Sequence, residues 1–143
     1  SLYLRGLVPN LTLHLPAPWD GHSFAETDCG NTANRYHHRA QAAHGQDGLA
    51  DLAEAINVRS ATVTHETAPK GMAPFFIRNA KVARDSHALL AFTLNRGADV
   101  GDSGTADTVR KFLARRSECE AKGELHSLRA FNFSLTDHRL YTL

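Results

Sequence analysis

Residues 75–112, FFIRNAKVARDSHALLAFTLNRGADVGDSGTADTVRKF, are the stretch from which the fold of this chain is best predicted. At their centre, residues 87–93 (HALLAFT) form a short apolar run between polar residues. Such a run is typical of a strand that is covered on both faces. We therefore expect a central strand here, with the side chains of residues 89–92 (LLAF) buried.

A glycine-rich loop follows this strand and leads into a helix. Gly97, Gly101 and Gly104 lie in the loop, and residues 105–116 carry apolar side chains at helical spacing. Glycine lets the backbone approach a ligand closely, and the N–H groups of a first helical turn have no partner inside the helix. A strand, a glycine loop and a helix in this order predict an anion-binding site at residues 101–105.

Strands and helices alternate along the rest of the chain. Residues 11–15, 58–64 and 127–133 have the β-branched or alternating apolar residues that are typical of strands. The alternation indicates an α/β protein with a mainly parallel sheet. We expect residues 58–64, 87–93 and 127–133 to form one such sheet, with helices on both faces.

The loops that follow the strands are expected to meet at one edge of this sheet, because right-handed crossovers bring them there. These loops are residues 16–24, 65–71 and 95–105. Asp20, His65 and Glu66 are the polar residues from which we expect ligand contacts at that edge. The alternative for the first loop is that Trp19 and Phe24 only close the edge of the core.

The length and net charge of the chain limit the number of domains and the kinds of partner that we expect. At 143 residues, we expect residues 1–143 to form a single domain with one core. The net charge of +1, with histidines neutral, gives no electrostatic reason to expect nucleic acid or a membrane surface as a partner. No apolar run approaches the roughly twenty residues that span a bilayer. We expect a soluble intracellular protein, and the start at Ser1 suggests a shortened N-terminus.

Neither the cysteines nor the histidines indicate a metal site. Cys29 and Cys119 lie far apart in the sequence, and we interpret them as free thiols. No HExxH or paired CxxC motif is present. The neighbours His37 and His38 would diverge by about 100° on a helix, so they cannot easily share one ion. We expect neither a metal nor a cofactor.

Two segments of the chain resemble a known superfamily. RNAKVARDSHALLAF (residues 78–92) and GDSGTADTVRKF (residues 101–112) are similar to the helix, strand and glycine loop of the Rossmann-like SLOG superfamily. This superfamily includes the LOG-type (lysine decarboxylase-like) phosphoribohydrolases and the DNA-processing protein A domains. The resemblance implies a Rossmann-like three-layer fold that binds a nucleotide or another phosphorylated small molecule.

The resemblance also implies roles for particular residues. The phosphate would lie on the backbone of residues 101–105, which are Gly101, Asp102, Ser103, Gly104 and Thr105, with hydroxyl donors from Ser103 and Thr105. Arg78 matches the arginine that the phosphoribohydrolases carry on the preceding helix. The alternative is that the glycine loop is a plain structural turn.

Catalysis is the part of the resemblance that the sequence leaves open. The phosphoribohydrolases carry a glutamate three residues after the loop threonine, and Thr108 occupies that position here. Asp107 is adjacent but points about 100° away around the helix. One hypothesis is a hydrolase that cleaves an N-glycosidic bond, with Arg78 and Asp107 as candidate catalytic residues and Glu66 or Asp20 as substitutes. The other is a non-catalytic sensor, or an accessory subunit of a larger assembly that retains the fold only. For either hypothesis, the sequence leaves open a homo-oligomer or a larger assembly.

Overall fold

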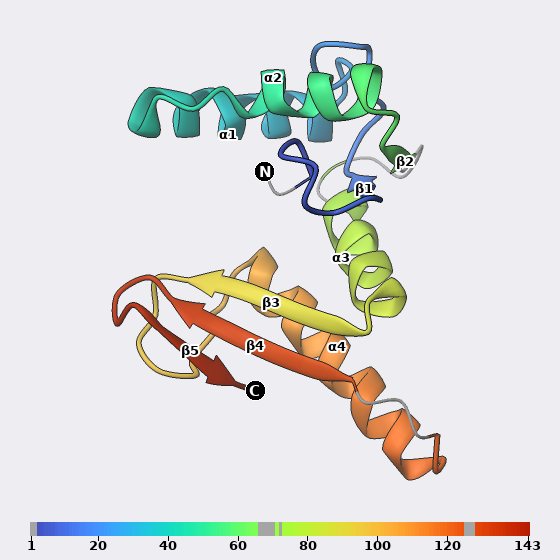
Figure 1. Cartoon of the computed structure of the whole chain (residues 1–143), viewed down its shortest axis with the longest axis vertical. Coiled ribbons are helices and arrows are strands. Elements are labelled where there is room, and N and C mark those ends of the chain that lie inside the picture. Colours follow the sequence, from blue (N-terminus) through green and yellow to red (C-terminus); the bar gives the residue numbers. More distant parts are fainter. Residues whose placement is uncertain (1–2, 66–70, 72, 125–127) are drawn as a thin grey trace. The chain divides into compact units, whose positions relative to one another are not determined.

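The computed structural model describes residues 3–65, 71, 73–124 and 128–143 (Figure 1). The chain forms two compact units, Ser1–Arg78 and Asn79–Leu143, and each is described here by itself. Both units combine helices with a pair of parallel strands, so the predicted α/β class is confirmed. The single domain expected from the chain length stays a prediction.

The first unit is built on two short parallel strands joined by helices. Its elements are β1 (Thr12–Leu15), α1 (Asp28–His44), α2 (Gly48–Ala53), a π-helical turn η1 (Glu54–Val58), β2 (Thr62–His65) and the first part of α3 (Ala73–Asp85). Thr12 lies opposite Thr62, and Leu15 lies opposite His65. The hydroxyl of Thr27 caps α1 by accepting from the Gly30 N–H.

The core of the first unit gathers around the loop that follows β1. Its buried residues are Leu15, Ala17, Phe24, Cys29, Ala33 and Leu49. Trp19 packs against this cluster, and its ring meets that of Phe24 edge to face, with centroids 5.4 Å apart. Trp19 and Phe24 therefore pack at the edge of the core, whereas a ligand contact from this loop stays a prediction.

The second unit contains a three-stranded sheet and a long helix. Its elements are the remainder of α3, β3 (Ala88–Thr93), α4 (Gly104–Ala121), β4 (Arg129–Ser134) and β5 (Arg139–Thr142). β3 and β4 are parallel, with Ala88 opposite Arg129 and Thr93 opposite Ser134, and β5 runs antiparallel to β4. α4 is the crossover between the two parallel strands and covers one face of the sheet (Figure 1).

Apolar side chains of α4 hold this helix to the sheet. Ala106, Val109 and Phe112 are buried, and they recur at the three-residue spacing of one helix face. Phe112 belongs to a core cluster with Ala83, Leu128 and Ala130. The predicted helix over residues 105–116 is therefore confirmed, with five more residues at its C-terminal end.

The prediction that β3 is covered on both faces is wrong. Ala91 is buried and Leu89 is half-buried, but the side chains of Leu90 and Phe92 are 52% and 57% exposed. β3 is an edge strand of its sheet, and α4 covers one of its faces. Only alternate side chains of a strand point to one face, so the apolar run of β3 is half covered.

The structure also differs from the expected single sheet. In the described part of the chain, the strands form two sheets, β1-β2 and β3-β4-β5, so β2 pairs with β1 and not with β3 or β4. β2 is shorter than expected, because Val58 ends a helical segment. The N–H groups of Arg59 and Ala61 still bond back to Glu54 and Ala55, and this keeps residues 58–61 out of the strand.

Across residues 3–65, 71, 73–124 and 128–143, the helices lack the combination of length and apolar character that a membrane crossing requires.

Candidate functional site

The loop after β3 is tied to the buried face of β4. The side chain of Asn132 is 0% exposed, and its Nδ2 donates to the carbonyl oxygens of Gly97 at 3.1 Å and Asp99 at 3.3 Å. Its Oδ1 accepts from the Thr93 hydroxyl at 3.0 Å. These three bonds use the hydrogen-bonding capacity of one buried amide to hold two points of the loop. The loop is therefore shaped by β4 before any ligand arrives.

A second set of bonds holds the loop to the turn between β4 and β5. The Ser134 hydroxyl donates to the Asn95 carbonyl at 2.7 Å, and Asp137 Oδ2 accepts from the Gly97 N–H at 2.6 Å. The Tyr141 hydroxyl donates to the same carboxylate oxygen at 3.2 Å. The Gly97 bond, against partial desolvation, holds the pKa of Asp137 below its ordinary value. An ionised Asp137 is thus part of the loop's support.

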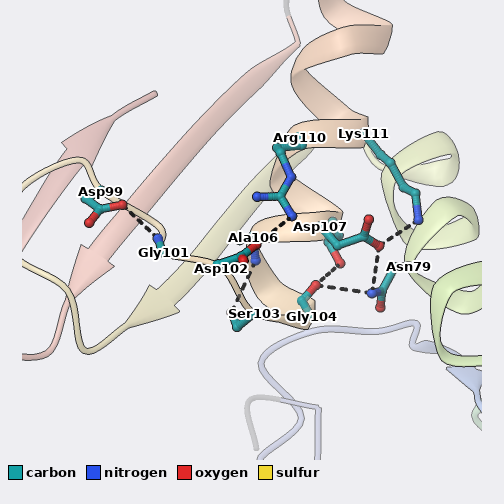
Figure 2. Close-up of polar contacts among 11 residues, drawn as sticks. Asn79, Asp99, Gly101, Asp102, Ser103, Gly104, Ala106, Asp107, Arg110 and Lys111 are labelled. Carbon is teal, nitrogen blue, oxygen red and sulfur yellow. Dashed lines mark hydrogen bonds and ion pairs between the residues drawn. The ribbon is translucent and has the colours of Figure 1, made fainter. Parts of the chain in front are cut away.

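Gly101 is required by the turn itself. Its φ of +70° lies in the left-handed region, and a Cβ there would meet Asn95 Nδ2 at 3.0 Å. Its N–H donates to Asp99 Oδ1 at 2.8 Å (Figure 2). Hydrogen bonds from Asn95 and Gly101 lower the pKa of Asp99. The turn geometry alone therefore explains the glycine at position 101, without a ligand.

Gly104 differs from Gly101, because the structure gives no packing reason for a glycine there. It is the first residue of α4, its φ is not in the left-handed region, and a Cβ would lie 3.8 Å from the nearest atom, Asn79 Nδ2. Ser103 caps the helix, with its Oγ accepting from the Ala106 N–H at 3.4 Å. The missing side chain at 104 leaves the start of α4 open to an approaching ligand.

Asp107 lies in the first turn of α4 and is held as a carboxylate. Its Oδ2 accepts from Asn79 Nδ2 at 3.0 Å and lies 2.6 Å from Lys111 Nζ, as Figure 2 shows. Partial burial acts to raise the pKa of Asp107, but the bonds from Lys111 and Asn79 and the charges of Lys111 and Arg110 outweigh it. The pKa therefore lies below its ordinary value, and Asp107 is a poor proton donor at neutral pH.

Asn79 is a site residue that the sequence analysis did not identify. The structure buries it, at 2% exposure, and its Nδ2 donates both to Asp107 and to the Gly104 carbonyl at 3.2 Å. Position 79 lies between Phe75 and Ala83 at four-residue spacing, which is one face of a helix. An asparagine on this apolar face was the signal that could have indicated a buried polar contact.

Arg110 and Thr108 lie near the start of α4, and they differ in how firmly their side chains are bonded. Arg110 lies 3.4 Å from Asp102 Oδ1, and both side chains are well exposed, so this ion pair contributes little to stability. Thr108, which occupies the position of the superfamily's glutamate, donates its hydroxyl to the Gly104 carbonyl at 3.0 Å. Arg110 can therefore exchange its partner for a ligand, whereas Thr108 is bonded back to its own helix.

Three of the other predicted site residues belong to the first unit. Asp20 accepts from the N–H groups of His22 and Ser23, and the Ser23 bond does most to lower its pKa. Its carboxylate therefore stabilises a turn. His65 is exposed at the end of β2. Arg78 is half-buried with its guanidinium 5.5 Å from the centre of the Phe75 ring, and desolvation lowers its pKa.

Glu66, the remaining predicted residue, lies outside the described residues. The meeting of Arg78, Asp20 and His65 with the loop at 101–105 stays a prediction, because that loop belongs to the second unit. Within the ranges that the structure describes, no group of three or more histidine, cysteine, aspartate or glutamate side chains is arranged to hold a metal ion.

Comparison with known proteins adds no relative. No protein-family model matches the sequence, and neither a curated protein nor a solved structure shows significant similarity to it. The resemblance to the SLOG superfamily therefore rests on residues 78–92 and 101–112.

Proposed function

We propose that the chain binds a nucleotide or another phosphorylated small molecule at residues 101–105. The observation that carries this proposal is Gly104, which opens the first turn of an 18-residue helix without a packing reason to lack a side chain. The N-terminus of such a helix attracts an anion through its free N–H groups and its dipole, which contributes about 0.3–2 kcal/mol.

The surroundings of Gly104 support a phosphate as the anion. The loop that leads to it is held by buried side chains of β4, so little conformational entropy is lost when a ligand binds. Ser103 and Thr105 supply hydroxyl groups beside it, and Arg110 lies near Asp102 of the same loop. Arg110 can form a charge-assisted bond to phosphate when it leaves the exposed carboxylate.

The fold that accompanies this proposal is the Rossmann-like three-layer fold. The parallel β3–α4–β4 unit supports it, because a strand, a loop and a helix that begins at the ligand form the phosphate-binding unit of such folds.

Binding without catalysis is the version that the geometry favours. Hydrolysis of an N-glycosidic bond is helped by a group that can protonate the leaving base, and the pKa of Asp107 is lowered, not raised. Thr108 cannot replace the superfamily's glutamate as an acid. We therefore place a non-catalytic sensor or accessory subunit first, and a nucleotide-directed hydrolase second.

Calorimetric titration with AMP and adenosine tests the binding site. We expect AMP to bind more tightly than adenosine to the parent, and Gly104→Val to abolish the difference by filling the open first turn. Arg110→Ala should weaken AMP binding, whereas Lys122→Ala, which removes one positive charge at the other end of α4, should not. Equal affinities for the two ligands, or normal AMP binding by Gly104→Val, would show that the loop is only a turn.

A separate measurement distinguishes a sensor from a hydrolase. Chromatography of AMP incubated with the protein should show no free adenine. If adenine is released and Asp107→Asn prevents its release while AMP still binds, then the hydrolase is correct and Asp107 takes part in the reaction.

A further inference from the structure

The first unit contains a pocket that is independent of the glycine loop. Its volume is about 460 Å³, within the range of about 300–1,000 Å³ that is usual for small-molecule sites. The lining residues come from the loop after β1, from α1 and from α2 with the residue before it. They are His22, Ser23, Asn34, His38, Asp47, Leu49, Ala50 and Ala53.

Asp47 gives this pocket its charge. With histidines neutral, it is the only charged side chain among the residues that line the pocket. Its Oδ1 accepts from the N–H groups of Leu49 at 3.1 Å and Ala50 at 3.0 Å, which caps α2. Both bonds end on Oδ1, and a carboxylate has further lone pairs on Oδ2. The pocket therefore offers a fixed negative charge with remaining acceptor capacity.

The rest of the lining divides into polar acceptors and an apolar wall. The imidazoles of His22 and His38 and the hydroxyl of Ser23 can each accept a hydrogen bond. Leu49 and Ala53, one helical turn apart, form an apolar surface beside Asp47. Arg35 and Arg39, which lie on the same helix as His38, are not among the lining residues.

We propose that this pocket binds a small molecule that carries a primary ammonium group on a hydrocarbon chain. The ammonium has three donors, which suit Asp47 Oδ2 and the neighbouring imidazole and hydroxyl acceptors. The hydrocarbon chain packs against Leu49 and Ala53. An anionic ligand would be repelled by Asp47, and a neutral alcohol would leave the charge of the carboxylate unused.

Amide NMR tests this proposal, because the amides of Leu49 and Ala50 bond directly to Asp47. We use n-butylamine at pH 7.5 as the probe and n-butanol as its uncharged equivalent. The Leu49 and Ala50 resonances should shift with saturation on addition of n-butylamine, and binding of n-butanol should be about tenfold weaker or undetectable.

Asp47→Asn is the decisive variant, because asparagine caps a helix about as well as aspartate while it lacks the charge. We expect it to fold normally and to lose n-butylamine binding by about tenfold or more. Asp51→Asn is the matched control: it removes the same charge from α2, and Asp51 is not among the lining residues. Binding that is equal for amine and alcohol, unchanged in Asp47→Asn, lost equally in Asp51→Asn, or undetectable in the titration of the parent with n-butylamine would overturn the proposal.

Discussion

In the β3-β4-β5 sheet, the covered face is largely polar and the open face is apolar, which is the reverse of most sheets that are covered on one side. The face toward α4 is buried but carries Ala91, Thr93, Asn132 and Ser134, which are small or polar. The other face carries Leu90, Phe92 and Leu140, all more than half exposed, with Phe131 and Phe133 beside them. An antiparallel or mixed sheet with one solvated face usually shows the reverse.

The difference separates two roles for side chains on one sheet. On the covered face, the polar groups of Thr93, Asn132 and Ser134 hold the loop after β3 by hydrogen bonds. These three positions therefore fix the shape of the loop and add little hydrophobic burial. On the open face, the rings of Phe92 and Phe133 lie 5.9 Å apart and extend an apolar surface. Exposed apolar patches are typical of interaction sites, and in destabilised proteins they favour aggregation. Mutations on the two faces should therefore have different consequences.

The largest effect is expected for Phe112→Ala on the covered side. The ring is 0% exposed within the core cluster of the second unit, and removing it leaves a cavity that α4 cannot fill without moving. We expect a loss of about 3–5 kcal/mol in the free energy of unfolding, measured by urea denaturation. A loss below about 1 kcal/mol would mean that α4 is not packed as described.

The next largest effect is expected for Asn132→Leu, because leucine is similar in size to asparagine but can neither donate nor accept a hydrogen bond. We expect a loss of about 1–3 kcal/mol in the free energy of unfolding, because the Gly97 and Asp99 carbonyl groups would lose the Asn132 Nδ2 donor and the Thr93 hydroxyl would lose its Oδ1 acceptor. AMP binding should also weaken, because the loop would lose its shape. If Asn132→Leu is as stable as the parent, then the polar character of the covered face has no structural role.

Leu90→Ala tests the open face of the sheet. Leu90 is 52% exposed, so we expect a cost of about 1 kcal/mol or less, and not the larger cost of a buried strand residue. Phe92→Lys should reduce the binding of a hydrophobic dye while the far-UV circular dichroism stays unchanged. A cost above about 2 kcal/mol for Leu90→Ala would show that this face is covered in solution.

The smallest effect is expected from pH, through Asp137 on the turn that supports the loop. Its folded-state pKa lies below the ordinary value of 3.8, so the stabilising contribution is present above that value and is lost as the pH falls through the folded pKa. Asp137→Asn should therefore make the free energy of unfolding less dependent on pH below about 4. An unchanged slope in acid urea titrations would contradict this assignment.

The sequence predicted the type of most elements but not which faces they cover. The strands at residues 11–15, 87–93 and 127–133 and the helix after the glycine loop lie close to their predicted positions. The double coverage of β3 was wrong because a continuously apolar run carries no alternation that would reveal an open face.

The candidate site was only partly visible in the sequence. The glycine loop and Asp107 were identified, but the glycines could not be told apart, since only φ and neighbouring atoms separate Gly101 from Gly104. Asn79 and Asn132 were missed because their partners lie 25 to 39 residues away along the chain. The ligand contacts expected of Arg78, Asp20 and His65 stay predictions, because these residues belong to the first unit.

The ties between β4 and the glycine loop also have a consequence for the order in which the protein is made. A ribosome that has synthesised the chain as far as the end of α4 has already joined every residue of the loop. None of the side chains that shape the loop from β4 onward yet exists, because Asn132, Ser134 and Asp137 follow by 35 to 40 residues. The loop should therefore acquire its final geometry only after the last strands emerge, so that a nascent chain stalled before residue 132 cannot yet hold the ligand.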